Sequence, residues 1–237
     1  EYVVGDDVRS IDWRSTARRG EVVVRTWRPE RDRRVLIVLD TGRMSAARVG
    51  GAPRLDTQIE TTLLLTALAS HAGDRVDVVA VDERQRAQVR GLSGPALISA
   101  LADALAPVDA AVTETDWGLV GQVVSQSLSQ RSLVVVLTGL DGSCVDAVMM
   151  RVLAVMARDH TVLLASVTDP DLEVLRATRG HPEAVFTAAA AERDLLELAA
   201  VRERLRRAGV EVVEAVPTEV APRVADTYLE LKRAGRL

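Results

Sequence analysis

The chain has 237 residues, of which 48% are hydrophobic and 27% charged, a globular composition long enough for one large α/β domain. The net charge of −4 and the aromatic content of 3% argue against a nucleic-acid binder, which needs a basic surface and often aromatic platforms. A single cysteine, Cys144, excludes an internal disulfide and a multi-cysteine metal site. No apolar run approaches the roughly 18 residues that indicate a membrane-spanning helix. Because the chain begins at Glu1, we interpret it as a fragment that an upstream targeting or membrane segment could precede.

Residues 1–34 differ from the rest of the chain, and we interpret them as an N-terminal arm. The first part is charged and rich in turn-forming residues, residues 21–27 predict an edge or extension strand, and residues 28–34 form a charged connector. Trp13 and Trp27 are expected to hold the arm against the main domain, residues 35–237.

The main domain alternates short apolar runs with amphipathic segments. The run over 35–39 has no polar break and contains β-branched residues, which is typical of a parallel strand covered on both faces. The pattern predicts an α/β fold, a mainly parallel sheet flanked by helices. The expected strands are 35–40, 76–81, 88–90, 133–137, 161–167 and 210–216, and the expected helices are 56–72, 93–106, 119–128, 145–158, 172–178, 189–208 and 220–233. Residues 41–54 and 180–192 are expected to be loops.

Three of the strands lead into aspartates, namely Asp40, Asp141 and Asp169. Right-handed crossovers bring such strand ends to one edge of a sheet, where ligands bind in open α/β folds. With Thr113 or Thr115 from a neighbouring loop, Asp40 and Asp141 would supply oxygen ligands suited to Mg²⁺. The alternative is that these aspartates cap helices or hold loops, which is the commoner role.

Motifs for other chemistries are absent from the sequence. There is no G-x-x-x-x-G-K-[ST], no G-x-G-x-x-G and no G-x-S-x-G, and Lys232 is the single lysine. The histidines, His71, His160 and His181, lie at element boundaries or in a loop, without a matching serine nucleophile. The residues therefore support neither nucleotide hydrolysis nor a serine hydrolase.

The arm carries charges of alternating sign around Trp13, from Asp6 to Arg19. Tryptophan and arginine are common interface anchors, so a docking surface is one interpretation. A local ion-pair network that holds the arm in place is the other.

The arm also carries a family resemblance. It reads Glu1-Tyr2-x-x-Gly5-Asp6-Asp7-x-Arg9-x-Ile11-Asp12-Trp13, followed by Ala17-Arg18-x-Gly20-Glu21. This run resembles a signature of the bacterial family called domain of unknown function fifty-eight. Members of that family resemble von Willebrand factor A domains and are often encoded beside MoxR-type AAA+ ATPases. The likeness continues through Leu39-Asp40-Thr41-Gly42-Arg43, Leu55-Asp56 and Gly73-Asp74-Arg75-Val76.

The resemblance implies a von Willebrand factor A-like, Rossmann-type fold, whose usual metal site has a D-x-S-x-S loop, a later threonine and a second aspartate. Asp40 matches the first aspartate, Thr113 or Thr115 the threonine, and Asp141 the last aspartate. Gly42 and Met44 stand where the serines would be, so two hydroxyl ligands are lost. We expect no resident cofactor, with Mg²⁺ as the possible exception. Arg43 is expected to fill the space by pairing with Asp40 or Asp141.

The resemblance predicts a non-enzymatic interaction domain, an adaptor or cofactor of a MoxR-type AAA+ ATPase in protein assembly or maturation. Its binding face comprises Asp40, Gly42, Arg43, Thr115 and Asp141, and the arm offers a second surface through Gly5, Asp6, Asp7, Arg9, Asp12, Trp13 and Arg14. The alternatives are a metal-dependent hydrolase that uses Asp40 and Asp141, and a structural module of a membrane-anchored protein. We expect a cytoplasmic domain with no nucleic-acid partner, and membrane contact only through a segment upstream of Glu1.

Overall fold

The computed structural model describes Arg18 and residues 33–141, 147–180 and 182–237. The chain divides into two units, Glu1–Asp32 and Arg33–Leu237, and the central sheet with its covering helices belongs to the second. The expected strand over 21–27 and both tryptophans of the arm lie outside the described residues.

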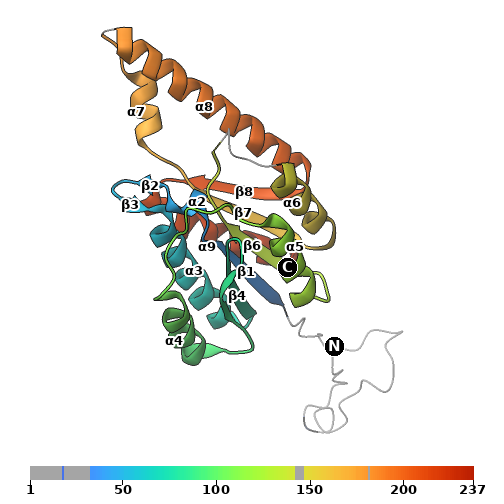
Figure 1. Ribbon diagram of the computed structural model, residues 1–237. Coiled ribbons are helices and arrows are strands. Elements are labelled where there is room, and N and C mark those ends of the chain that lie inside the picture. The colour runs from blue at the N-terminus through green and yellow to red at the C-terminus, as the bar shows by residue number, and fades with distance from the viewer. Residues whose placement is uncertain (1–17, 19–32, 142–146, 181) are drawn as a thin grey trace, which may run out of the picture. The chain divides into compact units, whose positions relative to one another are not determined.

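A six-stranded sheet forms the centre of this unit, with strand order β5-β4-β1-β6-β7-β8 (Figure 1). Only β5 is antiparallel to its neighbour, and the other four pairings are parallel. The apolar run of β1 is almost completely buried, as its sequence predicts. The strands are β1 (Arg34–Asp40), β4 (Arg75–Val81), β5 (Gln85–Val89), β6 (Leu133–Leu137), β7 (Thr161–Val167) and β8 (Val210–Ala215).

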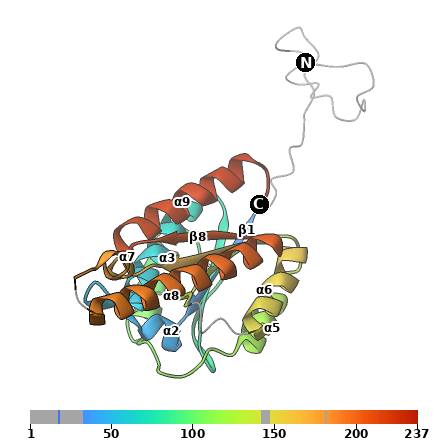
Figure 2. The same cartoon turned by 90° about the horizontal axis from the view of Figure 1, so that it is seen from above.

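Helices cover both faces of the sheet (Figure 2), and successive residues of β1 belong to two separate cores. Val35, Ile37 and Leu39 pack in the core beneath α3 (Arg54–His71), α4 (Gly94–Leu105) and α9 (Pro217–Arg233). Leu36 and Val38 pack in the core beneath α5 (Trp117–Ser127), α6 (Ala147–Asp159) and α8 (Pro182–Arg207). This two-sided burial explains the unbroken apolar run and confirms the predicted α/β class.

Residues 41–54 are not the loop that the sequence suggested. They contain a short helix, α2 (Arg43–Ala46), and a small hairpin of β2 (Arg48–Val49) and β3 (Ala52–Pro53). Gly50 and Gly51 have φ values of 59° and 89° at the turn, a region that favours glycine. Helix α3 then begins at Arg54, two residues before the expected start.

The expected loop over 180–192 is also wrong, because α8 begins at Pro182 and runs for 26 residues. Proline suits the first turn of a helix, and the alanines that follow have the highest helix propensity. The buried residues of this stretch are alanines, Ala184, Ala188 and Ala191, so the apolar period is hard to recognise in the sequence. Helix α7 (Asp171–Ala177) and the first half of α8 lie side by side and extend beyond the sheet (Figure 1).

Candidate binding face

Asp40, the last residue of β1, is the centre of a buried polar cluster at the carboxyl edge of the sheet. Its side chain is 2% exposed. Oδ1 accepts hydrogen bonds from the Gly42 N–H, at 2.8 Å, and from the Thr115 hydroxyl. Oδ2 accepts one from the Thr138 hydroxyl at 2.5 Å. The structure thus brings Asp40 and Thr115 together and adds Thr138, which the sequence did not single out as a site residue.

Two buried carboxyl groups at the carboxyl ends of neighbouring strands, Asp40 in β1 and Asp82 directly after β4, have pKa values shifted in opposite directions. Burial raises the pKa of Asp40, and the three hydrogen bonds, which lower it, do not reverse that effect, while the charge of nearby Asp82 raises it further. Burial also favours a higher pKa for Asp82, but hydrogen bonds from Arg86, the Arg84 N–H and the Thr41 hydroxyl, with the charge of Arg86, lower it. Asp82 thus has a guanidinium partner, Arg86, whereas the described hydrogen-bond donors to Asp40 carry no charge.

Glycine is required at position 42 because there is no room for a side chain. Its φ of −79° is accessible to any residue. A Cβ atom at this position would lie 2.3 Å from Thr115 Oγ1 and 2.9 Å from the Thr113 carbonyl oxygen. A serine cannot fit there unless Thr115 moves, so the threonine hydroxyl occupies the place of the missing serine. The sequence showed that the serine was lost but not what replaced it.

The cation that pairs with Asp141 is Arg54, which corrects the expectation that Arg43 would pair with Asp40 or Asp141. Arg54 Nη2 lies 3.1 Å from Asp141 Oδ1, and Nη1 lies 3.4 Å from the Met44 carbonyl oxygen. The Arg54 side chain is buried, and a Cβ atom at Gly139 would lie 3.0 Å from its Nη1. Arg43 Nε instead lies 2.6 Å from Glu114 Oε1. No sequence pattern distinguished Arg54 from its neighbours.

The loop over 108–116 lies across the ends of β1 and β4. Backbone hydrogen bonds fix it there, from Ala111 N to Thr41 O at 2.7 Å and from Arg43 N to Thr113 O at 2.9 Å. Val112 in this loop is 89% exposed, and Arg43 and Glu114 are also exposed. From here on, the term binding face means the accessible side chains at this edge, Arg43, Val112, Glu114 and Asp141, in place of the five residues expected from the sequence.

The residues at this edge do not form a site for the divalent ion, such as Mg²⁺, that the family resemblance implies. Gly42 and Met44 supply no hydroxyl groups, and Asp141 already pairs with the guanidinium of Arg54. Hard cations need several oxygen ligands, so the loss of two hydroxyls and the diversion of one carboxylate remove most of the site. Among the described residues, no group of three or more His, Cys, Asp or Glu side chains could hold a metal ion.

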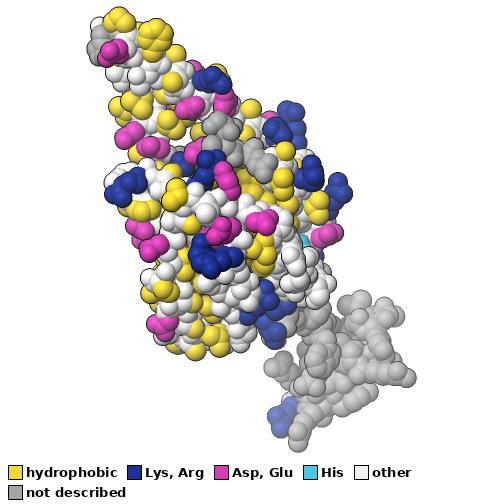
Figure 3. Space-filling view, in the orientation of Figure 1, with side chains coloured by type: hydrophobic (Ala, Val, Ile, Leu, Met, Phe, Trp, Pro, Cys, Tyr) yellow, Lys and Arg dark blue, Asp and Glu magenta, His cyan; other side chains and the backbone are white. Residues whose placement is uncertain are grey.

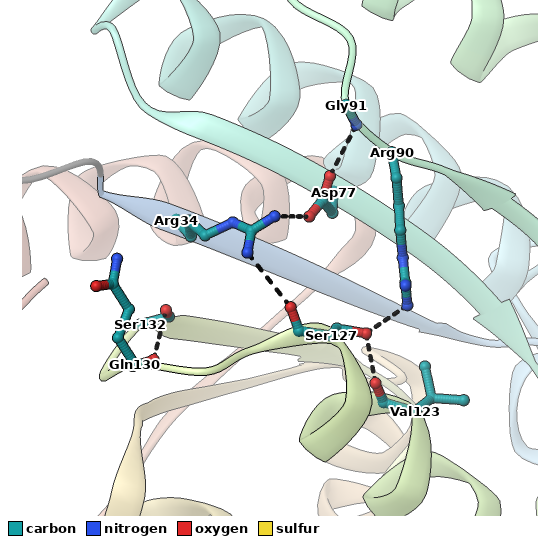
Figure 4. A network of polar contacts seen from close by, with 8 residues as sticks. All are labelled: Arg34, Asp77, Arg90, Gly91, Val123, Ser127, Gln130 and Ser132. Carbon is teal, nitrogen blue, oxygen red and sulfur yellow. Dashed lines mark hydrogen bonds and ion pairs between the residues drawn. The ribbon is translucent and has the colours of Figure 1, made fainter.

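Another buried aspartate, Asp77 of β4, lies at the amino edge of the sheet (Figure 4). Its carboxylate lies 3.3 Å from Arg34 Nη2 and accepts a hydrogen bond from the Gly91 N–H at 3.2 Å. Arg34 Nη1 also donates to the Ser127 carbonyl oxygen at 3.4 Å. These contacts connect β1, β4 and the C-terminus of α5.

The seven arm residues named as a docking motif, Gly5 to Arg14, lie outside the described residues. Their role as a second surface stays a prediction.

The fold has counterparts among solved structures. The conserved hypothetical protein BatB from Bacteroides thetaiotaomicron aligns over 85% of this chain and 99% of its own, with 13% identity and a TM-score of 0.51. An aerotolerance-related membrane protein from Bacteroides fragilis aligns over 82% and 96%, with 13% identity and a TM-score of 0.48. A von Willebrand factor type A protein from Catenulispora acidiphila gives 15% identity and 0.48 over 82% of this chain, which spans only 41% of that protein.

The strand order, with helices on both faces of a mainly parallel sheet, is that of a von Willebrand factor A-like α/β fold, and the BatB structure shares this fold. The family model described as "Protein of unknown function DUF58" matches residues 1–213. The chain therefore belongs to the DUF58 family, which confirms the resemblance found in the arm and in the Asp40 loop. No curated protein sequence matches the chain significantly.

Proposed function

We propose that this domain is a non-enzymatic protein-interaction module, an adaptor of a MoxR-type AAA+ ATPase in the assembly or maturation of other proteins. One observation carries the proposal: the buried carboxylate of Asp40 and that of Asp141 bind the protein's own donors, while Arg43, Glu114 and Val112 are exposed. The edge thus presents a preformed surface, which suits recognition of another protein. The identity of the ATPase rests on the family resemblance.

The binding face combines the features that protein partners use. An exposed apolar side chain, Val112, lies in the same loop as the charged Glu114, which pairs with Arg43. Exposed charges steer association and set specificity, while an apolar contact contributes affinity. Because backbone hydrogen bonds fix the loop, little conformational entropy is lost on binding.

The test is the binding of the purified domain to the MoxR-type ATPase encoded nearest to it, measured by biolayer interferometry with ATP, with ADP and without nucleotide. Arg43→Glu and Glu114→Arg should each weaken binding about tenfold. Their combination restores the internal ion pair but inverts the surface charges, so it should stay weak. Arg223→Glu serves as the matched control, because it also changes an exposed arginine that pairs with an exposed glutamate, Glu219, but on another element, α9.

Two outcomes would contradict the proposal. One is no binding in any nucleotide state. The other is full recovery in the Arg43→Glu, Glu114→Arg double variant, because that would mean the pair acts only by holding the loop.

The metal-dependent hydrolase has less support from the site. A metal-dependent hydrolase needs Asp40 and Asp141 to hold one cation together, whereas each carboxylate has its own protein partners. No helix in the described part of the chain is both long and apolar enough to cross a membrane. We place the domain in the cytoplasm, where such an ATPase has access to ATP.

A further inference from the structure

The second region of interest is the α7–α8 hairpin, defined as residues 171–197. All seven residues of α7 are described, and none of them is buried. The residues of α8 that are buried over this stretch are Ala184, Ala188 and Ala191. Small side chains let the two helices approach closely but bury little apolar area. Although Leu172 and Leu195 are partly buried, the hairpin therefore leaves most of its large apolar side chains exposed.

Those large side chains form an exposed apolar surface. Phe186, the single phenylalanine of the chain, is 77% exposed. Val174 of α7 and Leu196 of α8 are 64% and 62% exposed, and Leu175 and Val185 are exposed as well. In the space-filling view, hydrophobic side chains gather over α7 and the first half of α8 (Figure 3). Exposed apolar surface concentrated on one element is typical of an interaction site.

The same hairpin is acidic. Residues 171–197 hold six acidic side chains and three arginines, a net charge of −3. Two of the arginines are already engaged, since Arg176 pairs with Glu173 and Glu192, and Arg193 pairs with Glu197. The acidic side chains are Asp171, Glu173, Glu183, Glu192, Asp194 and Glu197.

We propose that the α7–α8 hairpin docks a basic amphipathic helix of a partner protein. A third helix would cover the exposed apolar side chains of two packed helices, and its lysine or arginine side chains would meet the acidic ones. Like charges oppose a second copy of the hairpin and an anionic membrane surface. This inference goes beyond the ATPase proposal, because it concerns a different surface and does not depend on the binding face.

The probe is a fluorescent helical peptide of leucine and lysine, about 18 residues and ~27 Å long. Its binding to the whole chain is followed by fluorescence anisotropy in about 150 mM salt, where long-range electrostatics are screened. Phe186→Ser and Val174→Ser, which leave the net charge unchanged, should each weaken binding about tenfold. Val155→Ser on α6 is the matched control, since Val155 is 50% exposed and lies outside the hairpin. A peptide with glutamate in place of lysine should not bind.

Several results would overturn the proposal. Equal binding of the lysine peptide to the wild type and to Phe186→Ser would reduce the interaction to non-specific electrostatics. A dimer in sedimentation equilibrium that Phe186→Ser dissociates would identify a second copy as the occupant. Co-sedimentation with phosphatidylcholine vesicles that Phe186→Ser abolishes would identify a lipid surface. A failure of the ATPase to bind leaves this experiment unaffected, so the two proposals fail independently.

Discussion

The carboxyl and amino edges of the sheet each hold a buried aspartate, but the two are stabilised differently. At the amino edge, the guanidinium of Arg34 lies beside Asp77 and neutralises its charge (Figure 4). At the carboxyl edge, the described donors to Asp40 are two hydroxyls and a peptide N–H, none of them cationic. The pKa of Asp40 is raised because burial disfavours its charged form.

This difference separates a contact that stabilises the fold from one that costs stability. Arg34 connects β1 to β4 and to the end of α5, so it adds cohesion where those elements meet. The Asp40 cluster places an uncompensated carboxyl group under the loop that carries the binding face. Local departures from the most stable arrangement are expected at functional sites. Substitutions at each edge can test whether the two differ in this way.

The largest effect is expected from Gly42→Ser, which restores a serine of the usual D-x-S-x-S loop. The new Cβ would lie 2.3 Å from Thr115 Oγ1, so Thr115 must leave Asp40. Overpacking of this kind costs about 3 kcal/mol of unfolding free energy. Urea denaturation measures the change, and adding Thr115→Ala should recover part of it. Wild-type stability in the single variant would show that the site has more room than the structure indicates.

The next effect is expected at the amino edge, from Asp77→Asn. The amide keeps an acceptor for the Gly91 N–H but leaves the guanidinium of Arg34 without its counter-ion. Breaking a buried pair costs about 3–5 kcal/mol, and the partial exposure of Arg34 reduces this to about 2 kcal/mol. The control is Glu211→Gln, which breaks the exposed pair with Arg236 and should cost less than about 0.5 kcal/mol. Equal losses of unfolding free energy in the two variants would show that the Arg34–Asp77 pair contributes no more than an exposed ion pair, which would contradict the difference between the two edges.

The sequence predicts those features of the two edges that follow from local patterns, and it does not predict those that depend on contacts between residues far apart in the chain. The unbroken apolar runs predict the parallel strands, because a strand covered on both faces needs no long-range information to be recognised. Asp40 and Asp141 follow from the strand ends. The resemblance left Thr113 and Thr115 as alternatives, and only the packing of the loop over β1 shows that Thr115 reaches Asp40.

The cations that neutralise these carboxylates were not predictable in the same way. The chain has many arginines, and the partner of Asp141 depends on where α3 begins and on the gap left by Gly139. The Arg34–Asp77 pair depends on the register between β1 and β4, which places Leu36 opposite Asp77. The early start of α8 was missed because its buried residues are alanines, which give a weak apolar signal.

A smaller effect is expected from Asp40→Asn, the same substitution at the opposite edge. The amide oxygen still accepts a hydrogen bond from Gly42, and no burial penalty for charge remains, so stability at pH 7 should change by less than about 1 kcal/mol. The raised pKa of Asp40 fixes the direction in which the stability changes with pH. The pKa of Asp40 in the folded protein is raised above 3.8. Asp40 therefore contributes to the free energy of unfolding below pH 3.8, and this contribution is lost as the pH rises through the folded pKa.

Asn does not titrate, so the variant should gain stability relative to the wild type as pH rises above 3.8. Asp82, whose pKa is lowered, contributes stability that is lost as pH falls, but it is present in both proteins and cancels in the difference. Urea denaturation from about pH 4 to 8 measures this trend. A pH-independent difference between the two proteins would mean that Asp40 has an ordinary environment.

The smallest effect is expected from Mg²⁺. A resident ion with a dissociation constant of about 1 mM would add about 1.4 kcal/mol of stability at about 10 mM Mg²⁺, a readily measured rise in melting temperature. We expect no rise and no fall with EDTA, because Gly42 and Met44 supply no hydroxyl and Arg54 already binds Asp141. Scanning calorimetry of the wild type and Asp40→Asn makes the comparison. A Mg²⁺-dependent rise that Asp40→Asn abolishes would show that the carboxyl edge binds a cation after all, and that its carboxylates rearrange to do so.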